Sequence, residues 1–241
     1  VKNIAKELGV IDKEVIPLMK AVEGYLVNIH ASGTRVKTKP DNFYDLGPIV
    51  GSSGEISQRT KEFLAERKTI VVYFGPTPVP ENFDGKICEL ARAYPEYNIL
   101  VIDNKKQFKM TEDLPKNVLV EVSTDLIAVA NDEHAELGII HGGLGTTTVF
   151  VNAGVPLTMS PTGSDQDGYA KTVEDLGAGF VVKKGNLDFR EVLEKFLQNR
   201  DYYKQNMMKA RDEKILATKD QDDRTSQEIA ADILFKAMEL G

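Results

Sequence analysis

Six short apolar runs, each alternating with a stretch of helical spacing or composition, constrain the fold of this chain more than any other feature. The runs are TIVVYF (69–74), YNILVI (97–102), NVLVEV (117–122), ELGIIH (136–141), VPLTMS (155–160) and GFVVKK (179–184). They are rich in β-branched residues, as strands are when helices cover both faces of a parallel sheet. Because crossovers between parallel strands are right-handed, the pattern predicts an α/β fold with a doubly wound parallel sheet.

The composition limits the classes of protein to which this chain can belong. Of 241 residues, 41% are hydrophobic and 28% are charged, which is ordinary for a globular protein. No apolar run approaches the roughly 20 residues of a membrane-spanning helix, so we expect a cytoplasmic location. The net charge of −7 argues against a nucleic-acid partner, because phosphate backbones are held by excess lysine and arginine.

The cysteine and histidine counts exclude two further classes. Cys88 is the only cysteine, so no internal disulfide framework exists, and we expect this residue in the core of the helix GKICELARAY (85–94). The three histidines are His30, His134 and His141, and their spacing matches no metal-ligand cluster. We therefore expect no metal and a small-molecule partner.

The segments on either side of the alternating region are less regular. Two helices are predicted first, VKNIAKELG and DKEVIPLMKAV, followed by a strand, GYLVNIHAS. A linker is expected around residues 40–56. At the other end, two further helices are predicted, DYYKQNMMKARDEKILATK and TSQEIAADILFKAMEL. The second begins with a capping box formed by Thr225 and Glu228. The sequence starts at Val1, without a methionine or a signal-peptide pattern, so we expect a piece of a longer protein.

The stretch HGGLGTTTVF (141–150) follows the fourth apolar run, where a strand should end and a helix begin. In doubly wound sheets, ligands bind at the carboxyl ends of strands. A helix N-terminus has unpaired N–H groups and a positive partial charge, so this turn can hold a phosphate. Alternatively, the glycines simply make a turn and the threonines decorate a helix start.

The residues around this turn resemble those of a known family. His141 to Gly143, Gly145 and Thr146 are followed by AGVP (153–156), by Pro161 with Asp165 and Gln166, and by LGAG (176–179). This order and spacing resemble the donor-binding half of the two-Rossmann (GT-B) UDP-glycosyltransferases, and the GTT triplet is similar to the sterol glucosyltransferase subgroup.

The resemblance implies a Rossmann-like C-terminal domain of a GT-B fold. Residues 1–48 would be the tail of an N-terminal acceptor domain, 49–66 a linker and first helix, and 67–241 the nucleotide-sugar domain with a C-terminal helix that crosses back. It further implies an inverting transferase that moves a sugar from a UDP-sugar, used as co-substrate without another cofactor, to a hydroxyl acceptor of small-molecule or lipid type. In the family the general base lies on the N-terminal domain, so no catalytic residue is expected here. That missing domain, in the same chain or as a separate subunit, is an expected partner, and we expect this chain alone to be inactive.

The expected donor site is built mainly around the HGG turn. Gly143 and Gly145 allow a diphosphate to approach the backbone, Thr146 and Thr147 add hydroxyl donors, and His141 donates to a phosphate oxygen. For His141 alone, a satisfied core histidine would be the simpler interpretation.

The sugar is expected to bind farther along the chain. Asp165 and Gln166 are suited to vicinal sugar hydroxyls, because a carboxylate accepts and an amide both donates and accepts. The alternative is that Ser164 or Asp165 only caps the following helix.

Other family positions are altered. Gly75 and Thr77 stand in the place of the family's FGS segment, with Thr77 replacing the serine hydroxyl. Val122 and Ser123 stand near the family's base-stacking tryptophan, so the base would be held by backbone groups and an apolar contact. Val149 replaces a ribose-binding glutamate, and Tyr169 replaces a common asparagine.

Two rival functions remain open. A nucleotide-sugar epimerase shares the two-Rossmann layout but needs catalytic carboxylates and a histidine around the donor cleft. A noncatalytic nucleotide-sugar-binding module, or one subunit of a split transferase, would keep the donor site without the acceptor site.

Overall fold

The computed structural model describes residues 25–27, 43–45, 51, 53–109, 113–163, 165–183, 185, 187–217 and 228–233. The chain divides into two compact units, one of residues 1–30, 34–49 and 216–241 and the other of residues 31–33 and 50–215. In the first unit, β1 (Tyr25–Val27) pairs in parallel with β2 (Phe43–Asp45). Strand β2 lies inside the segment expected to be a linker, because three residues are too few to produce an alternating pattern.

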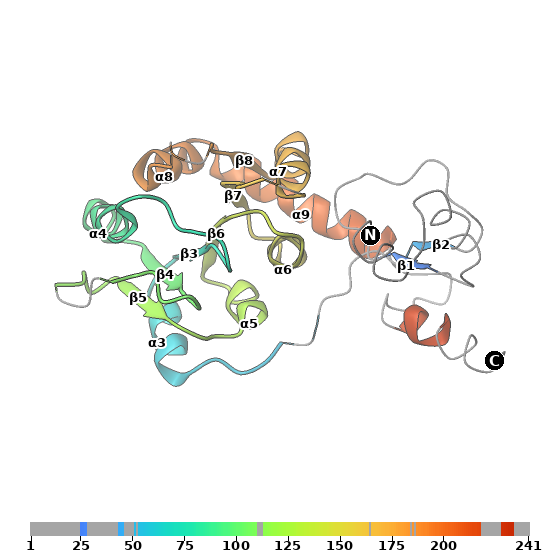
Figure 1. Cartoon of the computed structure of the whole chain (residues 1–241), viewed down its shortest axis with the longest axis horizontal. Coiled ribbons are helices and arrows are strands. Elements are labelled where there is room, and N and C mark those ends of the chain that lie inside the picture. Colours follow the sequence, from blue (N-terminus) through green and yellow to red (C-terminus); the bar gives the residue numbers. More distant parts are fainter. Residues whose placement is uncertain are drawn as a thin grey trace, which may run out of the picture. The chain divides into compact units, whose positions relative to one another are not determined.

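The second unit contains the predicted sheet (Figure 1). Its strands are β3 (Thr69–Tyr73), β4 (Asn98–Ile102), β5 (Val118–Glu121), β6 (Ala135–Ile140), β7 (Leu157–Met159) and β8 (Gly179–Val181). The strand order is β5-β4-β3-β6-β7-β8 and every pair is parallel. Each strand falls within one of the six apolar runs, allowing a residue at the ends, so the α/β doubly wound fold is confirmed.

Seven helices of the second unit follow the strands or flank them. They are α3 (Gln58–Glu66), α4 (Phe83–Ala93), α5 (Leu126–Ala130), α6 (Leu144–Ala153), α7 (Gln166–Asp175), α8 (Phe189–Gln198) and α9 (Arg200–Ala217). Helices α4 and α8 lie on one side of the sheet, and α5 and α6 lie on the other (Figure 1). None of the helices in the described part of the chain combines the length and hydrophobicity that a membrane span requires.

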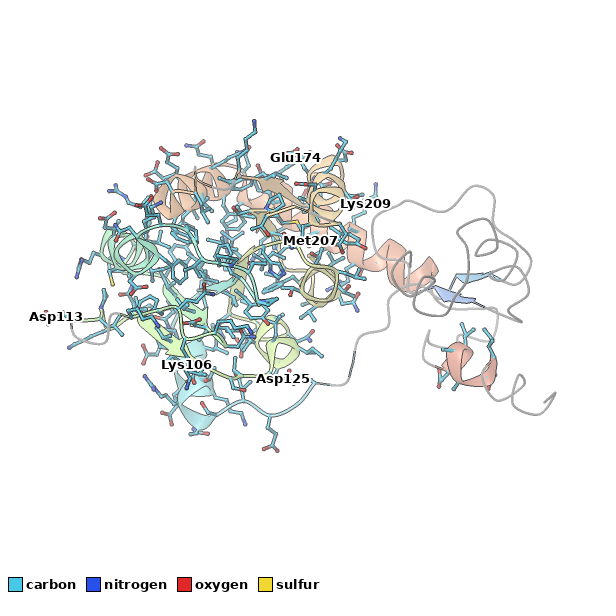
Figure 2. All side chains as sticks on the ribbon, viewed as in Figure 1. Lys106, Asp113, Asp125, Glu174, Met207 and Lys209 are labelled. Carbon is cyan, nitrogen blue, oxygen red and sulfur yellow. The ribbon has the colours of Figure 1, made fainter. Side chains whose placement is uncertain are left out.

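Two hydrophobic cores form because successive strand residues point to opposite faces. In β3, Ile70 and Val72 pack in the core that includes Leu193 of α8, whereas Val71 packs in the core that includes Phe150 of α6. Met207 of α9 is fully buried in this second core (Figure 2). Burial of each such side chain stabilises the fold by about 1.5–3 kcal/mol, which explains why the strands are predominantly apolar. Cys88 is buried in α4, as predicted.

The helix starts of the second unit differ in how they are capped. Ser57 caps α3, Asp188 caps α8 and Asp125 caps α5 through side-chain oxygens that accept backbone N–H bonds (Figure 2 labels Asp125). Helices α6 and α7 start at Gly143 and Asp165 without a side-chain cap. The first backbone N–H groups of α6 are therefore available to a ligand.

The strand order defines where the fold can bind a ligand. Strand β3 lies between β4 and β6, so the chain leaves β3 in one direction and later returns to pair on its other side. Such a topological switch point opens a crevice at the carboxyl ends of the two strands. The crevice here lies where β3 ends at Tyr73 and β6 ends at Ile140.

Candidate functional site

The predicted site residues all follow carboxyl ends of strands. Gly75 and Thr77 follow β3, Val122 and Ser123 follow β5, the HGG turn and the first turn of α6 follow β6, and Asp165 and Gln166 start α7 after β7. Three of these groups meet around the switch point, because β3, β6 and β7 are neighbours in the sheet. The groups after β3 and β5 are separated by β4, so the structure does not bring Val122 and Ser123 into this cluster.

His141 is the centre of the cluster. Its side chain is buried, with 6% of the residue exposed, and its Nδ1 atom has no hydrogen-bond partner within the described residues. The imidazole lies between two glycines: a Cβ added at Gly75 would lie 3.1 Å from Cε1, and one added at Gly143 would lie 2.5 Å from Nε2. The ring of Tyr73 meets it edge-on with centroids 6.4 Å apart. The backbone of Tyr73 acts on this imidazole, but Nδ1 still has no hydrogen-bond partner within the described residues, and a buried polar atom without a partner is costly.

Burial also sets the protonation state of His141. It lowers the pKa of the imidazole, and the backbone of Tyr73 and the negative charge of Asp165 only partly oppose this shift. The imidazole is therefore neutral near pH 7, with one nitrogen carrying a proton and the other able to accept a hydrogen bond. The same electrostatic interaction shows that Asp165, exposed at the start of α7, lies near the imidazole.

The first turn of α6 supplies a second set of donors. The first backbone bond into the helix runs from the N–H of Thr147 to the carbonyl of Gly143, at 2.9 Å. The N–H groups of Leu144, Gly145 and Thr146 therefore have no acceptor within the helix. A Cβ added at Gly145 would have nothing within 4 Å, so the space above this turn is open. Unpaired N–H groups beside a buried histidine form an anion-binding site.

Two predicted hydroxyl donors do not fit this site. The Thr147 hydroxyl donates to the Gly143 carbonyl at 2.9 Å, and the residue is only 2% exposed. The Thr77 hydroxyl donates to the Phe74 carbonyl at 2.6 Å. Each proton is used to close a local turn, a common arrangement for threonine beside a free backbone carbonyl. Thr146, which is partly exposed, keeps its predicted role.

The predicted reason for Gly143 is also corrected. Its φ of −65° is open to any residue, and the atom that a side chain would strike first is Nε2 of His141. Gly143 therefore makes room for the imidazole rather than for a ligand. Sequence reasoning gave no role to Gly142, which has a φ of +94° and packs on Met159 and Gln166. A glycine is needed there because side chains rarely adopt this conformation.

The start of α7 carries the two residues predicted to bind a sugar. Asp165 occupies the N-cap position but its side chain makes no capping bond, so capping does not account for this carboxylate. Gln166 uses its side-chain oxygen to accept from the N–H and the hydroxyl of Thr162, at 2.8 and 3.0 Å. These two hydrogen bonds hold the turn before α7. Ser164, the alternative cap, lies outside the described residues.

The predicted base contacts lie at the edge of the sheet. Val122 is 45% exposed, which is unusual for a large apolar side chain, and Ser123 is also exposed. Asp125, shortly after them, accepts bonds from the N–H groups of Gly54 and Ala128. An exposed valine offers an apolar surface for a base, and this role stays a prediction. No group of histidine, cysteine and acidic side chains within the described segments is arranged to hold a metal ion.

Comparison with known proteins gives one family match. The model described as "Erythromycin biosynthesis protein CIII-like, C-terminal domain" matches residues 90–233. This segment contains β4 to β8 and the whole HGG turn.

Curated relatives match the same part of the chain. An uncharacterized UDP-glucosyltransferase, YojK, of Bacillus subtilis (strain 168) is 30% identical over 129 residues, which are 52% of this chain and 28% of that protein. A sterol 3-beta-glucosyltransferase of Saccharomyces cerevisiae (strain YJM789) is 33% identical over 143 residues, which are 52% of this chain and 11% of that protein. The match spans less than a third of the length of each of these relatives.

Solved structures share the fold over most of the chain. The glycotransferase of kitacinnamycin has a TM-score of 0.74 at 20% identity, covering 97% of this chain and 60% of its own. Os79 from O. sativa, in complex with UDP, has a TM-score of 0.70 at 18% identity, covering 92% of this chain and 57% of its own. At this identity the likeness establishes a common fold.

Proposed function

The chain belongs to the family of erythromycin biosynthesis protein CIII-like C-terminal domains, and on this premise we propose that it binds a UDP-sugar as the donor half of an inverting glycosyltransferase. It is a glycosyltransferase C-terminal domain by family and by fold. We further propose which ligand binds, which residues hold it, and that transfer inverts the configuration of the anomeric carbon.

One observation carries the proposal: a buried histidine whose Nδ1 atom has no hydrogen-bond partner within the described residues stands beside uncapped helix N–H groups at the switch point of the sheet. Only 6% of His141 is exposed, and its Nδ1 atom lacks a hydrogen-bond partner within the described residues. The N–H groups of Leu144, Gly145 and Thr146 begin a helix without a side-chain cap. A diphosphate satisfies both sets of donors at once.

The same groups suit the chemistry of sugar transfer. When the bond between the anomeric carbon and the diphosphate oxygen breaks, negative charge develops on the UDP leaving group. Helix N–H groups that are already oriented stabilise that charge without reorganising. A neutral His141 contributes one N–H donor. We assign the binding of sugar hydroxyls to Asp165 and Gln166, which stand at the start of α7 after β7.

The names of similar proteins support UDP as the nucleotide. Os79, which shares the fold, was solved with UDP bound, and the yeast relative is named a sterol 3-beta-glucosyltransferase. The acceptor of this chain is accordingly proposed to be a hydroxyl compound. Its deprotonation requires a general base within hydrogen-bond reach, and we place that base on an N-terminal domain that completes the cleft.

Neither rival function gains a specific observation. An epimerase needs catalytic carboxylates and a histidine around the cleft, and Asp165 is the one carboxylate that acts electrostatically on His141 within the described residues. A noncatalytic donor module keeps the same anion site, so a measurement of activity, and not the geometry of the site, distinguishes it from a transferase.

Calorimetric titration of this chain with UDP and with uridine tests the proposal. UDP should bind far more tightly than uridine, because the main donors face the diphosphate. His141→Ala should weaken UDP binding by about 1–3 kcal/mol, the range for losing a hydrogen bond to a charged group, and should leave uridine binding unchanged.

His134→Ala is the matched control, because His134 is a partly exposed histidine whose ring pairs with Asp132 before β6 begins. It should leave UDP affinity as in the wild type. Equal affinity of the wild type for UDP and uridine would contradict the proposed diphosphate site.

A further inference from the structure

The loop that follows β3 starts directly against the proposed diphosphate site. Its residues 75–80 have the sequence GPTPVP. Gly75 has a φ of +58°, and a Cβ added to it would lie 3.1 Å from Cε1 of His141. The path of this loop therefore forms one wall of the space that the imidazole occupies.

The loop makes few hydrogen bonds of its own within the described residues. Its first turn is closed by the N–H and the hydroxyl of Thr77, which both donate to the Phe74 carbonyl at 3.1 and 2.6 Å. Pro76, Pro78 and Pro80 have no N–H group to donate. Proline fixes φ at these positions and Val79 packs on the core, but the hydrogen bonds that hold the backbone beyond the first turn come from elsewhere in the chain.

Gln107 supplies two such bonds. Its Nε2 donates to the carbonyl of Thr77 at 3.1 Å, and its Oε1 accepts from the N–H of Val79 at 3.2 Å. The two ends of one side-chain amide thus bind two residues of one loop, 28 to 30 positions away in sequence. A planar amide used in this way fixes both the position and the orientation of the backbone that it binds.

The segment that carries Gln107 is itself held in place. The N–H of Phe108 donates to the buried carboxylate of Asp103 at 2.6 Å, and the ring of Phe108 packs edge-on against Phe83 at 5.9 Å. Lys106, next to Gln107, is labelled in Figure 2. Gln107 also lines a small cavity, of about 10 Å³, that Gly75 lines as well. The amide thus reaches from an anchored segment to the wall of the His141 site.

We propose that Gln107 is a positioning residue of the donor site: by binding Thr77 and Val79, its side-chain amide fixes the loop that seats Gly75 against the imidazole of His141. The inference rests on the proposed function for the statement that this imidazole serves a diphosphate. The link from Gln107 to His141 rests on geometry alone. Gln107 acts through the loop and does not itself contact the ligand.

The test replaces the amide with a side chain of similar length that makes no hydrogen bond. In Gln107→Met, the imidazole signals of His141, identified by their loss in His141→Ala, should shift in the nucleotide-free protein because Gly75 no longer holds its place. UDP affinity should fall about five- to tenfold, as expected for two lost hydrogen bonds acting indirectly. Uridine affinity should stay unchanged, a pattern that a general loss of stability would not produce.

Gln198→Met makes the same chemical change at an exposed position near the end of α8 and should alter neither signal nor affinity. Unchanged His141 signals in Gln107→Met would overturn the inference, whatever happens to UDP. Shifted signals with unchanged UDP affinity would overturn the role in the donor site. A wild type that fails to bind UDP would instead overturn the proposed function, while the His141 signals still decide whether Gln107 holds the loop.

Discussion

Gly143 and His141 act as one unit at the scale of single residues. The imidazole occupies the space where a Cβ of Gly143 would lie, 2.5 Å from Nε2. Gly145, two residues later, faces open space and is exposed. Gly143 therefore makes room for the histidine, whereas Gly145 is proposed to leave room for the ligand.

Alanine at each glycine separates these purposes. Gly143→Ala should displace His141 and weaken UDP binding by about 1–3 kcal/mol, as loss of the imidazole itself would. Gly145→Ala should leave the fold as stable as the wild type or up to about 1 kcal/mol more stable, because alanine favours a helix. Its UDP affinity should fall because the new methyl group faces the anion.

Thermal melting and calorimetry with UDP measure both effects. A Gly143→Ala variant whose His141 signals and UDP affinity match the wild type would contradict the assignment of this glycine to the imidazole. A Gly145→Ala variant with full UDP affinity would show that the diphosphate lies away from this turn.

Asp165 is the second residue whose proposed role, binding of the sugar, can be tested by a single substitution. Its carboxylate occupies an N-cap position without capping, so its charge is available to a ligand. Asp165→Asn keeps the shape but turns an acceptor into a mixed donor and acceptor. We expect discrimination between UDP-glucose and UDP-galactose to fall while UDP affinity hardly changes.

The neighbouring change Asp167→Asn, at an exposed position in the first turn of α7, is the control and should leave both properties intact. Titrations with the two UDP-sugars measure the discrimination. If Asp165→Asn loses UDP itself, the carboxylate supports the site as a whole and does not select the sugar.

Helix α9 is fixed to the sheet by a buried ion cluster, the main electrostatic feature at the scale of elements. Glu136 of β6 is fully buried and pairs with Arg200 and with Lys204, the latter at 2.8 Å. Both cations are partly exposed, and both belong to α9. A carboxylate inside a strand thereby determines where the first two turns of this helix lie.

The cluster predicts how stability depends on pH. Burial alone would raise the pKa of Glu136, but hydrogen bonds and charges from Arg200 and Lys204 outweigh it and hold the pKa below its ordinary value. The unfolded chain therefore binds a proton more readily than the folded one in acid. The stability that Glu136 contributes is complete above about pH 4.3, the ordinary glutamate pKa. It is lost as pH falls through the lower folded value.

Glu136→Gln should remove this part of the acid dependence, because the amide does not titrate. At pH 7 it should also destabilise the fold, by about 1–3 kcal/mol, since two cations lose their charged partner. Urea unfolding at pH 7 and at pH 4 measures both effects, with the exposed Glu89→Gln as control. Equal loss of stability on acidification in the wild type and in Glu136→Gln would contradict the assignment.

At the scale of the whole molecule, the proposed function makes this chain one wall of a cleft. The donor residues gather at the carboxyl edge of the sheet, and the aligned segments are a small part of the relatives' length. Transfer requires an acceptor hydroxyl whose proton is removed as it attacks. The proposed function gives His141 and Asp165 to the donor and assigns that role to a separate N-terminal domain.

Residues 1–241 alone are therefore expected to bind UDP and to transfer no sugar. Adding the N-terminal half of the protein, in the same chain or as a separate polypeptide, should restore turnover. Release of UDP from UDP-glucose in the presence of candidate hydroxyl acceptors measures the reaction. Transfer by this chain alone, in a preparation free of other enzymes, would place the base within these residues.

The fold was predictable from the sequence because its signal is local. Each strand is a short apolar run that needs no knowledge of its neighbours to be seen, and the alternation of strands with helices limits the topology to a doubly wound sheet. The HGG turn was located for the same reason, since glycine and threonine at a strand-to-helix junction mark a helix N-terminus directly. The helices predicted before residue 25 and the N-cap predicted at Thr225 lie outside the described residues.

The roles of individual side chains were decided only by the tertiary structure. Thr77 and Thr147 look like ligand donors in the sequence, but each hydroxyl finds a backbone carbonyl within its own turn. Gly143 is explained by His141, and Gln107 reaches Thr77 across about 30 positions. A sequence pattern reports backbone conformation and burial, which depend on near neighbours. The partner of a polar group depends on which segments the fold brings within 3 Å, and that distance exists only once the chain has folded.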